Sequence, residues 1–226
     1  MGASRGIGAA TARALAAEGM AVALAGRDVV LPEDVARDCR EAGARTAVFP
    51  GDVTDNVYLA GLADAVRERM GTLHALFNNA GVLETARFDA ADLSRWEHTL
   101  DINFRALVHL TLVMLPLLLE HPESAVINLI SIAGRSSFSG GGIYCATKPA
   151  VHAFSGCLFE DLRDKGLKVC AIYPGYIATE MTSAVPGDRE KMIQAEDIAR
   201  TVSFLFRFPA NACPTEVVIR PQFPLP

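Results

Sequence analysis

A tyrosine and a lysine four residues apart, Tyr144 and Lys148, are the residues of this sequence best suited to do chemistry. Residues at this spacing share one face of a helix, so the phenol and the ammonium can point into one pocket. A phenol titrates near ~10, and lowering its pKa by roughly three units takes about 4 kcal/mol, which one ammonium at ~4 Å supplies in an effective dielectric of about 20. The spacing therefore predicts a tyrosine that moves a proton on or off an alcohol oxygen. A half-exposed tyrosine beside a solvated lysine would show the same spacing.

A glycine-rich stretch at residues 2–8 precedes a predicted helix over 9–18. Glycines let the backbone approach a pyrophosphate, whose charge then lies at a helix N-terminus. A predicted strand over 20–25 follows, and Gly26 and Arg27 come directly after it. An acidic residue here would bind a ribose 2′-hydroxyl, whereas an arginine accommodates a 2′-phosphate. Arg27, together with Arg5 in the glycine-rich stretch, favours NADP(H) over NAD(H), and two solvated arginines are the alternative.

Helical and strand patterns alternate along the rest of the chain. Expected helices cover residues 32–42, 57–70, 94–120, 143–164 and 195–206, and expected strands cover 45–49, 73–77, 125–131, 168–173 and 216–219. This alternation, with no linker or repeat, predicts one α/β domain over residues 1–226 with a doubly wound, Rossmann-type parallel sheet in three layers. The helix over 94–120 is apolar over most of its surface, which predicts burial on more than one side and a subunit interface.

The composition narrows the class of protein. Half of the residues are apolar and 21% are charged, which fits a buried sheet covered by helices, and the net charge of −5 argues against a nucleic-acid surface. The five cysteines form no CxxC pair and no histidine cluster has zinc spacing, so reduced thiols and no metal site are expected. The sequence opens with no signal peptide, and the apolar run 106–119 is too short to cross a bilayer. A soluble, cytoplasmic protein is expected.

Four short motifs follow one another along the chain. They are G-x-x-x-G-I-G at residues 2–8, N-N-A-G at 78–81, Ser131 with Tyr144-x-x-x-Lys148, and P-G-x-x-x-T at 174–179. Together they resemble the short-chain dehydrogenase/reductase (SDR) family over essentially the whole chain. The resemblance implies an oxidoreductase that transfers hydride between a nicotinamide cofactor and a small-molecule carbonyl compound or secondary alcohol. It also implies a homodimer or homotetramer, and the helices over 94–120 and 143–164 are the expected contacts.

The resemblance also implies a role for individual residues. Tyr144 would be the general acid/base, Lys148 would lower its pKa and hold the nicotinamide ribose, and Ser131 would bind the substrate oxygen. Asn103 would be the fourth catalytic residue, breaking its helix locally so that a water links Lys148 to solvent. The residues implied to contact the cofactor are Gly2, Ser4, Arg5, Gly6, Ile7, Gly8, Arg27, Asp52, Val53, Asn79, Ala80, Gly81, Tyr144, Lys148, Pro174, Gly175, Ile177 and Thr179. In that set the three glycines of the first motif surround the pyrophosphate, residues 52–53 meet the adenine, and residues 177 and 179 hold the carboxamide.

Two features depart from the family's pattern. The family has a central strand ahead of the glycine-rich loop, whereas this sequence begins at the loop. The strands over 20–25 and 73–77 are therefore expected to lack the partner between them, which would reflect an upstream start or a degenerate copy. Pro149 directly follows Lys148, and because proline is tolerated only in the first turn of a helix, that helix is expected to start no earlier than Tyr144.

Other functions stay open at this point. A catalytically silent nucleotide-binding or scaffold protein would explain the departure at the first strand, and an isomerase or dehydratase would use the same fold. The stretch over 181–194 is expected to form a lid on the substrate side, where its mixed composition suits a small or open-ended pocket. A mobile polar loop fits that composition equally well.

Overall fold

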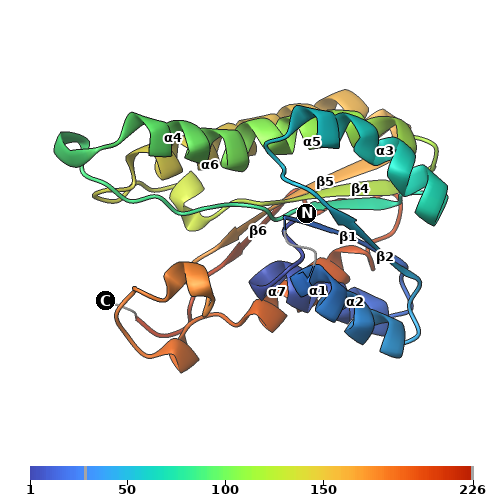
Figure 1. Cartoon of the computed structure of the whole chain (residues 1–226), viewed down its shortest axis with the longest axis horizontal. Coiled ribbons are helices and arrows are strands. Elements are labelled where there is room, and N and C mark those ends of the chain that lie inside the picture. Colours follow the sequence, from blue (N-terminus) through green and yellow to red (C-terminus); the bar gives the residue numbers. More distant parts are fainter. Residues whose placement is uncertain (28–29, 225–226) are drawn as a thin grey trace.

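Parallel strands form the middle of three layers in the computed structural model, which describes residues 1–27 and 30–224. Four helices cover the upper face in Figure 1: α3 (Asn56–Met70), α4 (Leu93–Leu100), α5 (Ala106–Leu118) and α6 (Gly142–Leu162). The lower face carries α1 (Gly6–Ala17), α2 (Val30–Glu41) and α7 (Ala195–Leu205). The predicted doubly wound α/β fold is therefore confirmed.

The strands form two groups that are not hydrogen-bonded to each other in the described part of the chain. One group pairs β1 (Val22–Gly26) with β2 (Thr46–Pro50). The other contains β3 (Ala75–Asn78), β4 (Ser124–Leu129), β5 (Leu167–Pro174) and β6 (Glu216–Ile219), in that spatial order. Every pairing is parallel, so all of these strands have their carboxyl ends at the same edge.

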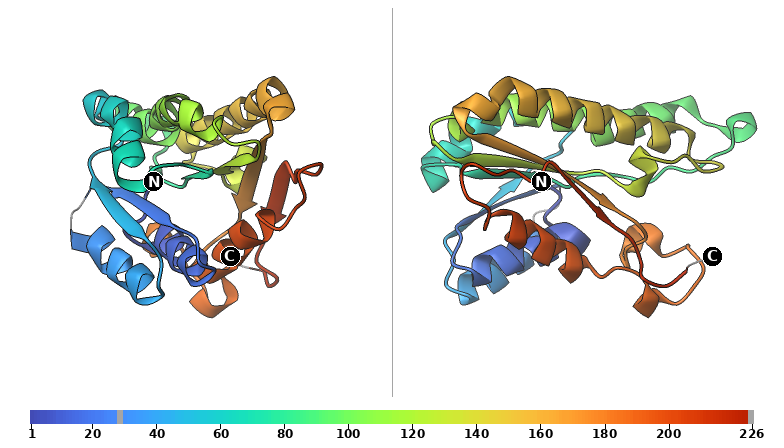
Figure 2. Two further views of the ribbon diagram at one scale, coloured as in Figure 1. Left: turned by 90° about the vertical axis from the view of Figure 1, so that its right-hand side faces the viewer. Right: turned by 180° about the vertical axis from the view of Figure 1, so that it is seen from behind.

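The first residues of the chain lie between the two groups of strands, near the middle of the molecule in both views of Figure 2. The Met1 ammonium donates to the Phe77 carbonyl of β3 at 3.0 Å, and the Gly2 amide donates to the Ala25 carbonyl of β1 at 3.0 Å. Burial lowers the pKa of the Met1 amine from 8.0 to about 6. The expectation that β1 and β3 are not direct neighbours is confirmed, and residues 1–2 supply one rung of contact between them.

The helix predicted over 94–120 is continuous but changes its winding. Between α4 and α5 a π-helical turn, η2 (Asp101–Arg105), interrupts the α-helical hydrogen bonding. The apolar run 106–119 is thus part of a longer helix, Leu93–Leu118, which by length and composition alone could cross a membrane, and 44% of its most apolar window is buried in the structure. The core helix of a soluble protein meets the same criterion, and this one packs against α3, α6 and β3.

The helix α6 begins at Gly142, two residues before the predicted limit, so Pro149 lies inside it. That prediction was wrong, and the position of Pro149 on the helix explains why. Pro149 is exposed, so the Cys145 carbonyl that loses its helical partner lies on the side of the helix that faces water. A helix tolerates a lost backbone bond where water can replace it.

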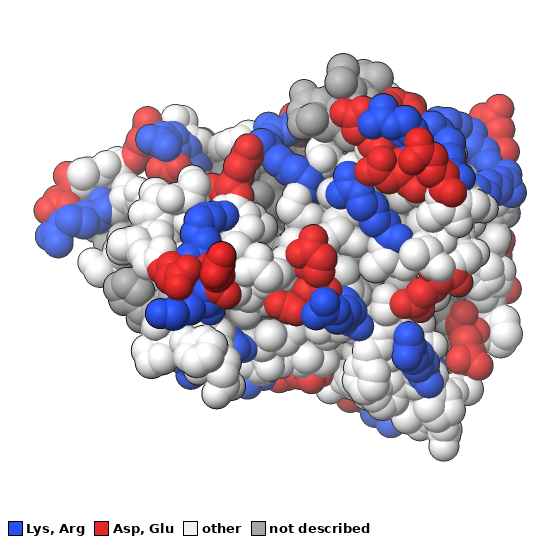
Figure 3. Space-filling model, turned by 90° about the horizontal axis from the view of Figure 1, so that it is seen from below, with Lys and Arg blue, Asp and Glu red and all other residues white. Residues whose placement is uncertain are grey.

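Acidic and basic side chains are interspersed on the face that includes α1, α2 and α7 (Figure 3). Several of them form ion pairs, such as Arg13 with Asp38 at 2.7 Å and Arg40 with Glu33 at 3.2 Å. This face therefore presents a mixed field rather than one dominated by a single sign.

Candidate active site

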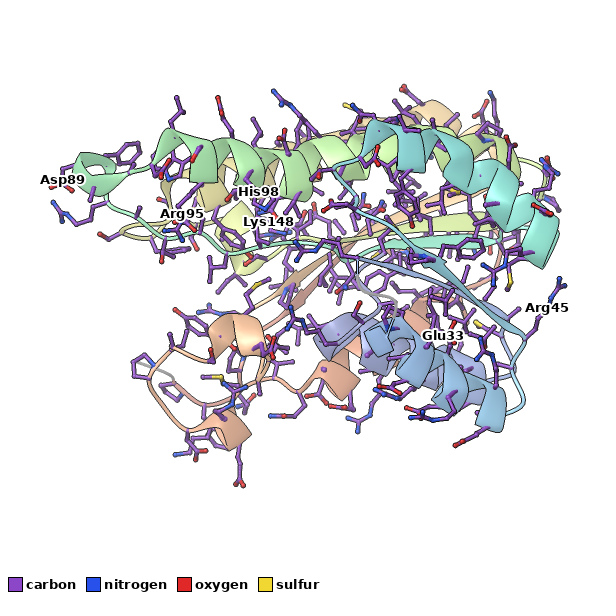
Figure 4. All side chains as sticks on the ribbon, viewed as in Figure 1. Glu33, Arg45, Asp89, Arg95, His98 and Lys148 are labelled. Atoms are coloured by element: carbon purple, nitrogen blue, oxygen red, sulfur yellow. The ribbon has the colours of Figure 1, made fainter. Side chains whose placement is uncertain are left out.

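Most of the residues predicted to act in a site follow the carboxyl ends of the strands. Asn79 follows β3, Ser131 follows β4, and Gly175 follows β5. Because the strands are parallel, these residues meet at one edge of the sheet, where ligands of doubly wound folds bind. In Figure 4 Lys148 lies at this edge, between the upper helices and the sheet, whereas Arg45 at the amino end of β2 lies on the opposite side.

Tyr144 and Lys148 face inward from the first turns of α6. Both side chains are buried, with 9% and 6% of their surface exposed, and the Lys148 ammonium lies 5.3 Å from the centre of the Tyr144 ring. The ammonium donates to the Leu129 carbonyl at the end of β4, at 3.4 Å. Ser131 is close enough to the phenol to interact with its hydroxyl, so Tyr144 has Lys148 and Ser131 as neighbours at the edge of the sheet.

The protonation state of this pair differs from the sequence-based expectation. Burial raises the pKa of the Tyr144 phenol, and the interaction with Ser131 opposes that rise only in part. Burial also lowers the pKa of Lys148 from 10.5 to about 8. The expected lowering of the phenol pKa by the lysine is therefore wrong for the protein alone, because burial is the dominant influence on both groups. Tyr144 is a neutral proton donor at pH 7.

The buried ammonium of Lys148 makes stability depend on pH. Above pH 8 the folded protein releases the Lys148 proton while the unfolded chain keeps it, so the free energy of unfolding rises with pH. Relative to Lys148→Met, the wild type should gain about 2 kcal/mol between pH 8 and roughly 9.5, at 1.36 kcal/mol per pH unit. Urea unfolding at both pH values measures the difference. The exposed Lys165→Met variant is the control, and an equal gain in the wild type and Lys148→Met would contradict the prediction.

Asn103 lies in the π-turn, which confirms the predicted local break in its helix. Its side chain is buried and bonds the Val82 backbone twice, accepting from the amide at 2.8 Å and donating to the carbonyl at 2.9 Å. A Cβ atom added to Gly81 would lie 3.4 Å from the Asn103 oxygen and 3.8 Å from the Lys148 ammonium. Asn103, Gly81 and Lys148 are thus neighbours, and the absence of a side chain at Gly81 leaves the space between them free.

The glycine-rich stretch forms a tight turn into α1. Gly2 has a φ of 72°, and Cβ atoms on Gly2 and Gly8 would lie 2.8 Å from the Asn79 amide and 2.1 Å from the Gly2 carbonyl. The Asn79 amide donates to the Gly2 carbonyl at 2.8 Å, which ties this turn to the end of β3. In the described part of the chain no side chain caps the N-terminus of α1. Its first amide groups are oriented to bind an anion.

The residues predicted for the adenine end lie beside β1 and β2. A Cβ on Gly26 would lie 2.5 Å from the Ser4 hydroxyl, so Ser4 reaches the end of β1 where Arg27 follows. A backbone hydrogen bond from Thr54 holds the pKa of Asp52 below its usual range, and the charges of Arg27 and His98 lower it further. Arg27 and Asp52 are therefore close enough to share one end of the site.

The motif at 174–179 approaches the glycine-rich turn from the other side. The Thr179 methyl group would lie 3.3 Å from a Cβ on Gly6, so residue 179 packs over the start of α1. Ile177 is buried in an apolar cluster with Ile193 and Ile198. Only the backbone of Ile177 is therefore available to a ligand. Beyond Thr179, the expected lid contains two short turns, η5 (Glu180–Thr182) and η6 (Arg189–Lys191), rather than an unstructured polar loop.

A buried chain of polar side chains joins the helices that carry the site. The Asn78 amide donates to Thr111 of α5 at 3.0 Å and to Asn128 of β4 at 2.8 Å, and Asn128 donates to Ser155 of α6 at 2.8 Å. All four side chains are fully or nearly fully buried. The Asn78 side-chain oxygen has no hydrogen-bond partner in the described part of the chain, so the network is not fully satisfied, but its three bonds link α5 and α6 to β3 and β4.

Two hollows of the described chain lie away from the predicted site residues, and the first is a small cavity. It has a volume of about 120 Å³ and lies at the opposite, amino end of the strands, lined by Ser124, Lys168 and Cys170 among others. A second hollow, between the loop after β3 and α4, is lined by Val82, Glu84, Ser94, Arg95, His98 and Thr99. It lies beside Asn103, which bonds Val82, but contains none of the predicted site residues. The candidate active site is therefore identified from the arrangement of its side chains and not from a cavity.

Comparison with known proteins agrees with the fold and the motifs. The short chain dehydrogenase family profile matches residues 1–190, so the chain belongs to this family. An uncharacterized oxidoreductase of Staphylococcus aureus is 32% identical over 97% of this chain and 94% of its own length. An alcohol dehydrogenase of Thermococcus sibiricus, solved with 5-hydroxy-NADP, superposes with a TM-score of 0.92 at 25% identity, covering 100% of this chain and 96% of that one. A metagenomic short-chain oxidoreductase solved with NADP has a TM-score of 0.86 at 28% identity, covering 99% of this chain and 95% of that one.

Sequence reasoning missed several residues that shape the site. Val82 donates one hydrogen bond to Asn103 and accepts another from it, and the Leu129 carbonyl accepts from the Lys148 ammonium, in each case through backbone atoms that no residue-type pattern reveals. Phe138 lies with its ring centre 6.5 Å from that of Tyr144 and is 46% exposed. Its position between the two catalytic motifs was the one available signal. Glu180, which lies just before the stretch predicted as a lid, was given no role, although it forms an ion pair with Arg5.

Proposed function

We propose that this protein is an NADP(H)-dependent oxidoreductase that transfers hydride between nicotinamide and a carbonyl group or secondary alcohol, with Tyr144 as the acid/base. One observation carries the proposal. Tyr144 has Lys148 and Ser131 as neighbours at the carboxyl edge of the sheet, and Lys148 lies beside Gly81 and Asn103. A buried phenol, a lysine and a hydroxyl in this arrangement suit proton transfer to or from an alcohol oxygen. That the chain is an SDR oxidoreductase follows from the family match.

The residues of the chain fit a nicotinamide cofactor. The uncapped N-terminus of α1 offers amide groups to a pyrophosphate, and Gly2 and Gly8 leave no room for side chains on that turn. The space beside Gly81 lies next to the Lys148 ammonium, where a ribose hydroxyl would be held. A cofactor bound there would supply or accept the hydride.

The chain's own groups would handle the proton. Tyr144, neutral at pH 7 because of its raised pKa, donates its proton to the substrate oxygen in the direction of reduction. The Ser131 hydroxyl donates a hydrogen bond to the same oxygen and orients it. Lys148 holds a positive charge below pH 8 and stabilises the phenolate that remains after the transfer. In the direction of oxidation the same groups take the proton back.

We expect NADPH to bind more tightly than NADH. Arg27 directly follows β1 and Arg5 lies in the glycine-rich turn, and a 2′-phosphate bound between them would gain charge-assisted hydrogen bonds from both. Such bonds contribute about 1.5–3 kcal/mol each, so one of them gives roughly a ten- to hundredfold preference. Titration of the protein with each nucleotide, followed by cofactor fluorescence, measures the ratio. Arg27→Gln should reduce it at least severalfold without changing NADH binding.

Two outcomes, one of that titration and one of a turnover assay, would reject the proposal. Equal affinities for both nucleotides would remove the NADP(H) preference. Binding of NADPH without turnover of any ketone or alcohol in a broad panel would instead favour a catalytically silent nucleotide-binding protein. The unpaired facing edges of β1 and β3 are the observation that keeps this second function in view, because they border the cofactor turn.

We also propose that the protein associates through α5 and α6. Leu112 of α5 is 56% exposed, and the outer face of α6 carries small or apolar residues such as Pro149, Ala153 and Cys157. Exposed apolar residues on adjacent helices are typical of a subunit interface, and a second copy presents the same face. The molar mass in solution tests this. A cytoplasmic location is proposed as well, since the cysteines of the chain are free thiols.

A further inference from the structure

The ion pair between Arg5 and Glu180 links the glycine-rich turn to the lid. Arg5 precedes α1, whereas Glu180 begins the first lid turn, η5, and the two charges meet across the start of α1. Arg5 lies within the first of the four motifs, whereas Glu180 lies one residue beyond the last of them.

Glu180 is held in place by the backbone around it. Thr179 packs against Gly6, and its carbonyl accepts a hydrogen bond from Arg189 of η6 at 3.0 Å. The Thr182 hydroxyl lies 3.2 Å from the same carbonyl. The Glu180 carboxylate therefore lies next to the glycine-rich turn because of the local structure around residue 179, and not only because of its attraction to Arg5.

Arg5 has room to exchange partners. Its side chain is 61% exposed and that of Glu180 is 73% exposed, so the guanidinium is free to turn toward a different anion. The proposed 2′-phosphate position lies toward Ser4 and Arg27, at the end of β1. Arg5 directly follows Ser4 in the chain, so the guanidinium that pairs with Glu180 belongs to the same turn as the residue that reaches the end of β1.

We propose that Glu180 is a specificity-determining residue that competes with the cofactor 2′-phosphate for Arg5. This inference rests on the proposed function, in which Arg5 binds that phosphate. In the protein alone Glu180 neutralises Arg5, and binding of a 2′-phosphorylated nucleotide breaks the ion pair. Glu180 therefore weakens NADPH binding and leaves NADH binding unchanged.

The test compares Glu180→Gln with the wild type in NADPH, NADH, 2′,5′-ADP and 5′-AMP titrations. We expect NADPH and 2′,5′-ADP to bind about three- to fivefold more tightly to the variant, the size of one exposed ion pair. NADH and 5′-AMP should bind as they do to the wild type. The gain should shrink in high salt, because exposed charges are screened.

Two further variants separate this role from a general change in charge. Glu190→Gln removes the same charge from the same lid, at a side chain with no ion pair in the described part of the chain, and should have no effect. In an Arg5→Gln background, Glu180→Gln should no longer change NADPH affinity. Unchanged NADPH affinity in Glu180→Gln, an equal gain for NADH, or persistence of the gain without Arg5 would each overturn the inference. If the wild type binds neither NADPH nor 2′,5′-ADP, the proposed function fails first and the inference falls with it.

Discussion

Replacing Tyr144 with phenylalanine should lower turnover by about 10²–10⁴-fold, the usual contribution of a positioned general acid. The phenol is the proton donor nearest to Ser131 and Lys148, and phenylalanine keeps the ring that packs in this buried position. NADPH affinity should stay within about threefold of the wild type, because the phenol contacts the substrate side of the site. Steady-state kinetics and a nucleotide titration of the same preparation measure both quantities.

Tyr58→Phe is the matched control for this experiment. The Tyr58 hydroxyl donates to the Phe49 carbonyl at 2.8 Å, away from the proposed catalytic group, so its removal should cost some stability and leave turnover unchanged. Wild-type turnover in Tyr144→Phe would reject Tyr144 as the acid/base. Loss of both turnover and NADPH binding would indicate that the substitution disturbs the fold instead, which thermal melting of the two variants would reveal.

An added strand ahead of Met1 should raise the melting temperature by roughly 10–20 °C. The facing edges of β1 and β3 carry backbone groups that no strand pairs in the described part of the chain, and residues 1–2 already contact both strands by hydrogen bonds. Six alternating valine and isoleucine residues would continue this bridge. Each new hydrogen bond contributes about 1 kcal/mol, and 1 kcal/mol shifts the melting temperature of a chain of this size by about 2–4 °C.

The extension would also move the charged amine out of the interior. Burial lowers the pKa of the Met1 amine to about 6. At pH 7 or below the unfolded chain therefore binds this proton more readily than the folded protein does, which lowers the free energy of unfolding. A glycine-serine extension of equal length relieves this charge without adding a strand, and is therefore the control. If both extensions raised the melting temperature equally, strand pairing would not be the cause.

Much of the fold and the site could be predicted from the sequence because it depends on local rules. Strand β6 lies over the predicted residues 216–219, and the break at Asn103 coincides with the π-turn. Glycines at residues 2 and 8 have the close backbone approaches that their spacing indicated. Motifs that follow parallel strands meet at one edge whatever the loops between them, so the grouping of Ser131 with Tyr144 also followed from the order of the motifs.

The features that the sequence predicted wrongly or did not reveal depend on the three-dimensional surroundings of the residues. The direction of the Tyr144 pKa was wrong because spacing gives the distance to Lys148 but not the burial of both groups. The start of α6 was wrong because a pattern does not show that Pro149 faces water. The pairing of Arg5 with Glu180 joins residues far apart in the chain, and neither residue type indicates the other.

The π-turn at Asp101–Arg105 sets the rotational phase of the helix that contains it. One extra residue in a turn rotates everything beyond it by about 100° relative to a regular α-helix. This offset lets α4 face the loop at Val82 and Glu84 while α5 buries Leu110 and Met114. Deleting a single residue here would leave an unbroken helix yet turn the buried side of α5 outward. Insertions and deletions in this segment should therefore disturb the packing of α5 far more than substitutions do. An alignment of related sequences must keep the number of residues in this segment constant.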